Sequence, residues 1–248
     1  MILDTFTYKE LYSTLLSVYR EIADRAHGFA GPNLKKLRGL CKNGEYHRPF
    51  YATIKNQRYR LGVVYQQCPK GVFVGIRALH TVISNNNRKL VIEAKSLENS
   101  GPTLTLLISV YTEHFLNRFC ERSQQCIDDL PLLEKACLFY DNKDINVASS
   151  REDEIIRRHG EPSLEVAFLP KENRNIECFC FKTGDIAIVE KYDTIPVWRT
   201  YITEDMLFAS QKNDTSYIET VAESVEIQDT EADKQWVPQN WRELPNKG

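Results

Sequence analysis

The sequence of 248 residues has no long apolar run and no excess of either charge, and each absence excludes a class of protein. No stretch approaches the roughly 20 consecutive apolar residues of a membrane-spanning helix. The first residues, MILDTFTYKE, lack the basic-then-apolar order of a secretory signal. We therefore expect a cytoplasmic protein without membrane contact. The formal net charge of −2 argues against a generally basic surface, so any contact with nucleic acid would need a local patch.

Several motifs that bind ligands or carry catalysis are also missing. GxGxxG, GxxxxGK and GxSxG do not occur, which argues against nucleotide-binding α/β enzymes and esterase-type hydrolases. The seven cysteines are odd in number and scattered, so we expect reduced, mostly buried thiols. Cys178 and Cys180 lie on an expected strand, and Cys120 and Cys126 have no matching pair of histidines. We expect neither a metal nor a cofactor.

The most basic patch of the chain lies on a short helix expected over residues 33–41, which follows a longer helix expected over residues 8–27. The helix carries Lys35, Lys36 and Arg38, and Lys42 lies just beyond it. A basic helix face can bind the phosphate backbone of RNA, and these four are our candidate nucleic-acid-binding residues. A charge run of this size is, however, more often a solvated helix face, and both interpretations stay open.

Hydrophobic patterning predicts an α+β protein with N-terminal helices and an antiparallel β-meander, then a helix plus a second antiparallel meander. The first strands are expected over residues 50–56, 58–66, 72–79 and 90–94, and the later strands over 164–169, 176–182, 185–191 and 197–202. Helices are expected after residue 112, over residues 129–140 and over residues 204–211. We divide the chain into a helical and β-meander region, 1–103, a region with the candidate site, 104–219, and an acidic flexible tail, 220–248. The tail carries Trp236 and Trp241, which would dock back or recognise a protein partner.

The strongest candidate for a catalytic site lies in residues 104–125, where an apolar run passes through Thr112, a typical N-cap residue, into an amphipathic helix. The side chains that share one side of this helix are His114, Arg118, Glu121 and Arg122. Cleavage of a phosphodiester without a metal needs proton carriers, here His114 or Glu121, and cations that bind phosphate, here the two arginines. An ordinary exposed helix face has the same composition, with Glu121 free to pair with Arg118.

The order of a helix with His-x3-Arg-x3-Arg, followed by a meander whose last strand carries Thr or Tyr, resembles the toxin ribonucleases of the barnase/EndoU/colicin/RelE-like superfamily. The matching residues are His114, Arg118 and Arg122 on the helix and Thr200 and Tyr201 on the closing strand, within residues 104–210. The resemblance implies a metal-independent endoribonuclease, a toxin or defence effector, that cleaves RNA through attack by a 2′-hydroxyl. In such an enzyme His114 would act as acid or base, and Arg118 and Arg122 would bind the phosphate. Thr200 or Tyr201 would position that phosphate.

Glu121 joins this candidate site as a second proton carrier because of its chemistry, not because of the resemblance. A different class of function also fits the sequence. A non-catalytic binding or scaffolding protein would use the basic helix at residues 33–41 and the acidic tail for its partners. The two hypotheses differ in whether His114, Arg118 and Thr200 meet in one concave pocket.

Overall fold

The computed structural model describes residues 6–30, 32–40, 45–68, 71–84, 87–96, 106–123, 130–142, 145–146, 168–169, 174–181 and 183–208. The expected acidic tail, 220–248, lies outside these residues, as do Lys42 and most of the strand expected over residues 164–169. None of the described helices is both long enough and apolar enough to cross a membrane.

A single β-sheet runs through the described part of the chain, with the strand order β1-β2-β3-β4-β5-β9-β8-β7-β6. Its strands are β1 (Glu45–Ile54), β2 (Gln57–Cys68), β3 (Gly71–Ile83), β4 (Lys89–Ser96), β5 (Leu106–Thr112), β6 (Ile145–Asn146), β7 (Arg174–Phe181), β8 (Ile186–Tyr192) and β9 (Ile195–Ile202). The described strand pairs are antiparallel except for β5 and β9, which are parallel. The two expected antiparallel meanders are therefore confirmed, and the parallel pair joins them into one α+β fold.

The turn between β1 and β2 shows how local sequence sets the first meander. Lys55 and Asn56 both have positive φ angles, 48° and 64°, as the two central residues of a tight hairpin of the mirror-image type require. Strand β2 therefore begins at Gln57, one residue before the strand that the sequence predicts. The predicted boundary between regions falls between β4 and β5, which pair with each other, so strands from both predicted regions belong to one sheet. The division into regions stays a prediction.

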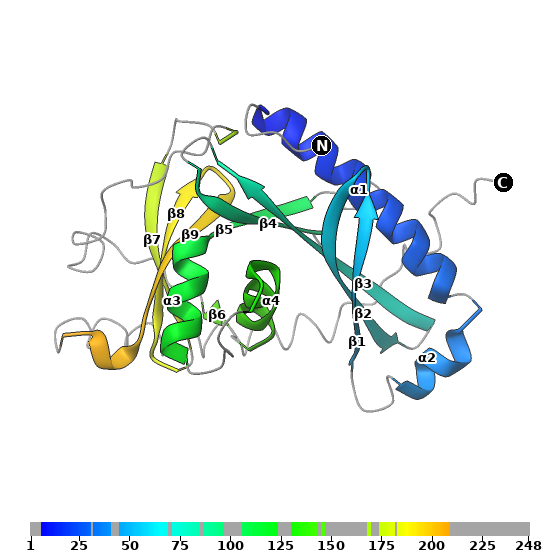
Figure 1. Ribbon diagram of the computed structural model, residues 1–248. Coiled ribbons are helices and arrows are strands. Elements are labelled where there is room, and N and C mark those ends of the chain that lie inside the picture. Colours follow the sequence, from blue (N-terminus) through cyan, green and yellow to red (C-terminus); the bar gives the residue numbers. More distant parts are fainter. Residues whose placement is uncertain are drawn as a thin grey trace.

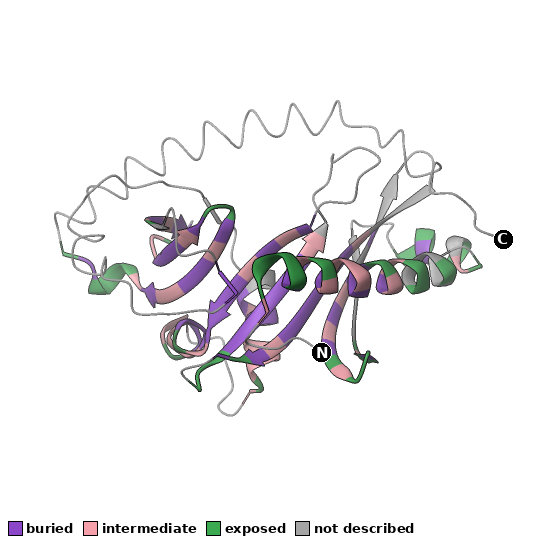
Figure 2. Cartoon of the chain, turned by 90° about the horizontal axis from the view of Figure 1, so that it is seen from above, coloured by how far each residue is buried: buried purple, intermediate pink, exposed green. Residues whose placement is uncertain are grey.

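Helices cover both faces of the sheet (Figure 1). They are α1 (Tyr8–Ala30), α2 (Leu34–Leu40), α3 (Glu113–Ser123) and α4 (Leu132–Asn142). Successive residues of a strand point to opposite faces. On β4, Leu90 belongs to the core beneath α1 and α2, whereas Val91 belongs to the core beneath α3 and α4. The two helix pairs therefore lie on opposite faces. Figure 2 shows the outer side of α1 exposed above largely buried strands.

The core beneath α3 and α4 is mostly aromatic and fixes the position of α3. Phe139 of α4 packs edge-on against Phe115 of α3, with ring centroids 4.8 Å apart, and contacts Trp198 of β9 at 5.2 Å. Edge-to-face pairs of this kind each stabilise a fold by about 1 kcal/mol beyond the area they bury. Ala136, Cys137 and Phe139 of α4 are all buried, and Phe139 is 0% exposed.

Two local predictions need correction. Where the sequence predicts a helix over residues 204–211, the structure describes a 3-10 turn, η1 (Glu204–Met206). The next residue, Leu207, is extended, and its side chain packs into the core behind β7 and β8. Cys120 is disulfide-bonded instead of reduced. Disulfides persist mainly in oxidising compartments, so this bond is unusual for a cytoplasmic protein, and a cytoplasmic location stays a prediction. Cys178 and Cys180 are free and buried, as expected.

Candidate functional site

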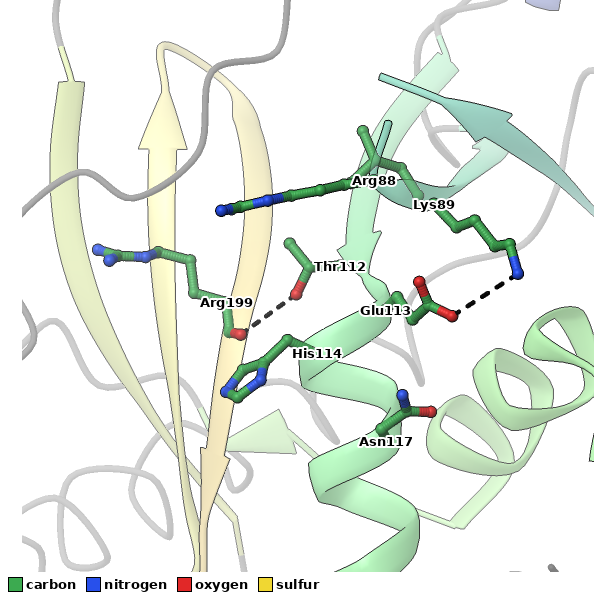
Figure 3. Close-up of a pocket in the computed structure, with 8 residues that line it drawn as sticks. Arg88, Lys89, Thr112, Glu113, His114, Asn117 and Arg199 are labelled. Atoms are coloured by element: carbon green, nitrogen blue, oxygen red, sulfur yellow. Dashed lines mark hydrogen bonds and ion pairs between the residues drawn. The ribbon is translucent and has the colours of Figure 1, made fainter. Parts of the chain in front are cut away.

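A cavity of about 530 Å³ opens where α3 begins, within the size range of small-molecule and cofactor sites (Figure 3). It is lined by Arg88, Lys89, Leu90, Thr112, Glu113, His114, Asn117 and Arg199, and we call it the α3 cleft. These residues come from the start of β4, the end of β5, the first turns of α3 and the middle of β9. The parallel pairing of β5 with β9 is what brings Arg199 beside the start of α3.

Thr112 joins three walls of the α3 cleft through one hydroxyl. Its Oγ1 accepts a hydrogen bond of 3.0 Å from the backbone N–H of Phe115, which confirms Thr112 as the N-cap of α3. The same hydroxyl donates to the backbone oxygen of Trp198 at 2.9 Å and lies 3.2 Å from that of Arg199 (Figure 3). The cap is itself buried. It therefore holds His114, two residues later, in a fixed position relative to Arg199.

Arg199 reaches the cleft through an irregularity of the sheet. Thr200 pairs with Ile188 and Trp198 pairs with Val189, so Arg199 is an extra residue on β9 in its register with β8. Such β-bulges redirect a side chain and are common beside functional sites. The Nε of Arg199 lies 3.9 Å from Oε2 of Glu190, whose side chain is 0% exposed. This buried carboxylate favours one orientation of the guanidinium.

Positive charge predominates in the α3 cleft. Arg88, Lys89 and Arg199 line it together with a single carboxylate, Glu113. The Nζ of Lys89 lies 4.0 Å from Oε1 of Glu113, and both side chains are exposed, so this ion pair is weak. Figure 3 shows the guanidiniums of Arg88 and Arg199 extending to the same side of the cleft, away from that pair. Two guanidiniums on one side favour an anionic ligand with several acceptor oxygens, such as a phosphate.

His114 is the titratable group of the α3 cleft that can exchange protons near neutral pH. Partial desolvation lowers the pKa of His114 below its usual value, and the guanidiniums of Arg118 and Arg122 lower this pKa further. The imidazole is therefore mostly neutral at pH 7 and is able to accept a proton.

The other charged residues predicted on this helix face lie near His114 but do not line the cleft. The Nη1 of Arg118 lies 2.9 Å from Oε2 of Glu121, and both side chains are exposed. This is the pairing expected of an ordinary solvated helix face. The Nη1 of Arg122 donates a hydrogen bond to the backbone oxygen of Tyr201, so Arg122 ties α3 to β9.

The two candidates on β9 also lie away from the cleft lining. Tyr201 is 0% exposed, its ring packs edge-on against Phe119 at 5.4 Å, and its hydroxyl donates to Oδ2 of Asp185. Burial raises the pKa of Tyr201. Thr200 is half-buried. The structure thus brings His114 together with Arg88 and Arg199, and it does not bring Arg118, Thr200 or Tyr201 into the same pocket.

The basic helix α2 is remote from the α3 cleft. Lys35, Lys36 and Arg38 are all exposed, and Leu37 anchors the helix in the core. Figure 1 shows α2 and α3 at opposite ends of the molecule. The two cationic sites would therefore contact different parts of any ligand.

No family model, no curated protein and no solved structure matches this chain. The resemblance to toxin ribonucleases therefore stays a prediction. The cleft residues that the sequence analysis missed are Arg88, Lys89, Glu113, Asn117 and Arg199. Arg88 and Lys89 come just before the strand expected over residues 90–94, but only the pairing of β4 with β5 shows that they lie beside α3.

Proposed function

We propose that this protein binds RNA in the α3 cleft and cleaves it there without a metal, as an endoribonuclease. The observation that carries the proposal is the position of His114 in the same cavity as Arg88, Lys89 and Arg199. The cations supply binding sites for a phosphate, and the imidazole supplies a base beside it. A role as a toxin or defence effector rests on the sequence resemblance.

In this mechanism His114 takes the proton from a ribose 2′-hydroxyl, and the 2′-oxygen attacks the adjacent phosphorus. The bond from phosphorus to the 5′-oxygen breaks, which leaves a 2′,3′-cyclic phosphate and a 5′-hydroxyl. The departing oxygen takes its proton from water in the open cleft. Arg88 and Arg199 stabilise the negative charge that develops on the phosphate oxygens. Arg118 and Arg122 contribute by lowering the pKa of His114, so that it is a base at neutral pH.

The test is cleavage of RNA in EDTA by the wild type and by His114→Ala, Arg199→Gln and Arg20→Gln. Arg20 is an exposed arginine of α1, on the other face of the sheet, and its variant is the control for loss of one positive charge. We expect His114→Ala to cleave at least about a hundredfold more slowly, the scale of a lost general base. We expect the control to cleave at the wild-type rate. Equal cleavage by wild type and His114→Ala, with both folded by circular dichroism, would contradict the mechanism.

A non-catalytic RNA-binding protein is the second candidate. It is favoured because Arg118 and Thr200 do not line the pocket that holds His114. The pairing of Glu121 with Arg118 also favours it, because this pair is typical of a solvated helix face. Binding is measured separately with an RNA methylated at every 2′-oxygen, which cannot be attacked by its own hydroxyl. Binding that depends on Arg199, without cleavage of ordinary RNA, would identify this second function.

A further inference from the structure

We propose that the sheet face beside α4 extends the α3 cleft into a binding surface for single-stranded RNA, with Tyr51 and Arg58 at its far end. This surface depends on the RNA binding proposed for the α3 cleft. Figure 1 shows α4 lying between α3 and the first strands of the sheet, on the side of the sheet opposite α1. The extended surface is therefore the part of that face beyond α4.

The strand register places the relevant side chains on this face. Tyr51 pairs with Arg60, and Arg60 pairs in turn with Leu79. Residues that pair across strands share a face, and Leu79 packs in the aromatic core beneath α3 and α4. Tyr51 and Arg60 therefore belong to the α4 side. Arg58 is two residues from Arg60 and has the same orientation.

Tyr51 and Arg58 have the chemistry of a platform for a nucleobase. Tyr51 is 40% exposed, and the Cζ atom of Arg58 lies 4.2 Å from the centroid of its ring. Proteins that bind single strands without sequence preference stack bases on exposed aromatic rings and bind the backbone with neighbouring cations. The same pair also stabilises the hairpin by a cation–π interaction. The two roles are compatible because Arg58 is itself exposed and presents its charge to solvent.

The orientation of the Tyr51 ring is set by α4. The Tyr51 hydroxyl donates to Oε1 of Glu134, and the Nε of Arg60 donates to the same oxygen at 2.9 Å. Glu134 is in the first turn of α4. The Tyr51 ring is therefore held by the hydrogen bond at its hydroxyl and by the guanidinium of Arg58 near its face. A ring held in this way loses little conformational freedom when a base stacks on it.

The platform is continuous with the α3 cleft through α4. Lys135, next to Glu134, donates a hydrogen bond of 2.8 Å to Oδ1 of Asn117, which lines the cleft. Ile83 pairs with Lys89 of the cleft and is 57% exposed on the same face. Two strand spacings and a two-residue offset separate the Cα atoms of Arg58 and Lys89 by roughly 12 Å. A short single strand therefore reaches from Lys89, which lines the cleft, to Arg58 and the Tyr51 ring beside it.

The test compares binding of a dinucleotide with binding of an oligonucleotide of about eight nucleotides, both methylated at the 2′-oxygens. The variants are Tyr51→Leu, Tyr51→Phe, Arg58→Gln and Arg199→Gln, with Tyr8→Leu and Arg20→Gln as matched controls for an exposed tyrosine and an exposed arginine of α1. We expect Tyr51→Leu to raise the dissociation constant of the longer oligonucleotide about tenfold and to leave that of the dinucleotide unchanged. Tyr51→Phe keeps the ring but loses the hydrogen bond to Glu134, so it should bind the longer oligonucleotide more weakly than the wild type and more tightly than Tyr51→Leu.

The outcomes separate the two proposals. If Arg199→Gln weakens both ligands while Tyr51→Leu and Arg58→Gln weaken neither, the α3 cleft binds RNA and the extended surface is refuted. If Tyr51→Leu weakens the dinucleotide as much as the longer oligonucleotide, the effect is not that of a remote platform and the inference fails. If the folded wild type binds neither ligand, the proposed function fails and the extended surface fails with it.

Discussion

Replacing Thr112 by valine should destabilise the protein and also disturb the α3 cleft. Valine has nearly the shape of threonine but no hydroxyl, so the change removes hydrogen bonds with little change of packing. The backbone N–H of Phe115 loses its acceptor, and the backbone oxygen of Trp198 loses its donor. Loss of a helix cap costs about 1 kcal/mol, and loss of the buried bond to a carbonyl costs about 1 kcal/mol more.

The expected decrease in the free energy of unfolding is therefore about 2 kcal/mol, which corresponds to a fall in Tm of about 4–8 °C for a chain of this size. Urea denaturation followed by far-ultraviolet circular dichroism measures it. Thr53→Val is the matched control, because Thr53 is exposed on β1, where valine is a favourable strand residue.

The same substitution should weaken RNA binding in the cleft, because the Thr112 hydroxyl holds the start of α3 against β9. A Thr112→Val variant within about 0.5 kcal/mol of the wild type, the range of ordinary surface substitutions, would refute the reasoning. It would mean that neither hydrogen bond contributes measurably and that the position of His114 does not depend on this cap.

Three further predictions concern other parts of the molecule. Tyr201→Phe removes the hydroxyl that donates to Asp185 and should lower the free energy of unfolding by about 1–2 kcal/mol. RNA cleavage should persist in this variant. A loss of cleavage in the folded variant would return Tyr201 to the catalytic site. Burial lowers the pKa of His80 below its usual value, so the unfolded chain takes up a proton as the pH falls below about 6.5 while the folded chain does not. The free energy of unfolding should therefore fall as the pH drops through this range, and less so in His80→Phe; an equal pH dependence in both would contradict this. Finally, Cys120 should resist alkylation in the unfolded protein until a reductant is added. Mass spectrometry of the peptide that contains Cys120 measures this. Alkylation of Cys120 without a reductant would disprove the disulfide.

Local sequence was enough to predict the features that depend on neighbours along the chain. Hydrophobic spacing predicted the helix over residues 8–27, and the structure has α1 there, with Leu11, Leu15 and Ile22 buried against the sheet. Thr112 was recognised as an N-cap because capping involves only residues within one turn. The pairing of Arg118 with Glu121 was foreseen for the same reason, since residues three apart on a helix are adjacent.

The composition of the candidate site was decided by tertiary structure. Arg199 joins the α3 cleft because β9 pairs with β5 and carries a bulge, and neither the partner strand nor the bulge is marked in the sequence around it. Tyr201 leaves the predicted site because α3 packs over its face of β9, which converts a polar candidate into a core residue. Periodicity shows which side chains share a face of one element. It does not show which other element covers that face, because that depends on contacts between residues far apart in the chain.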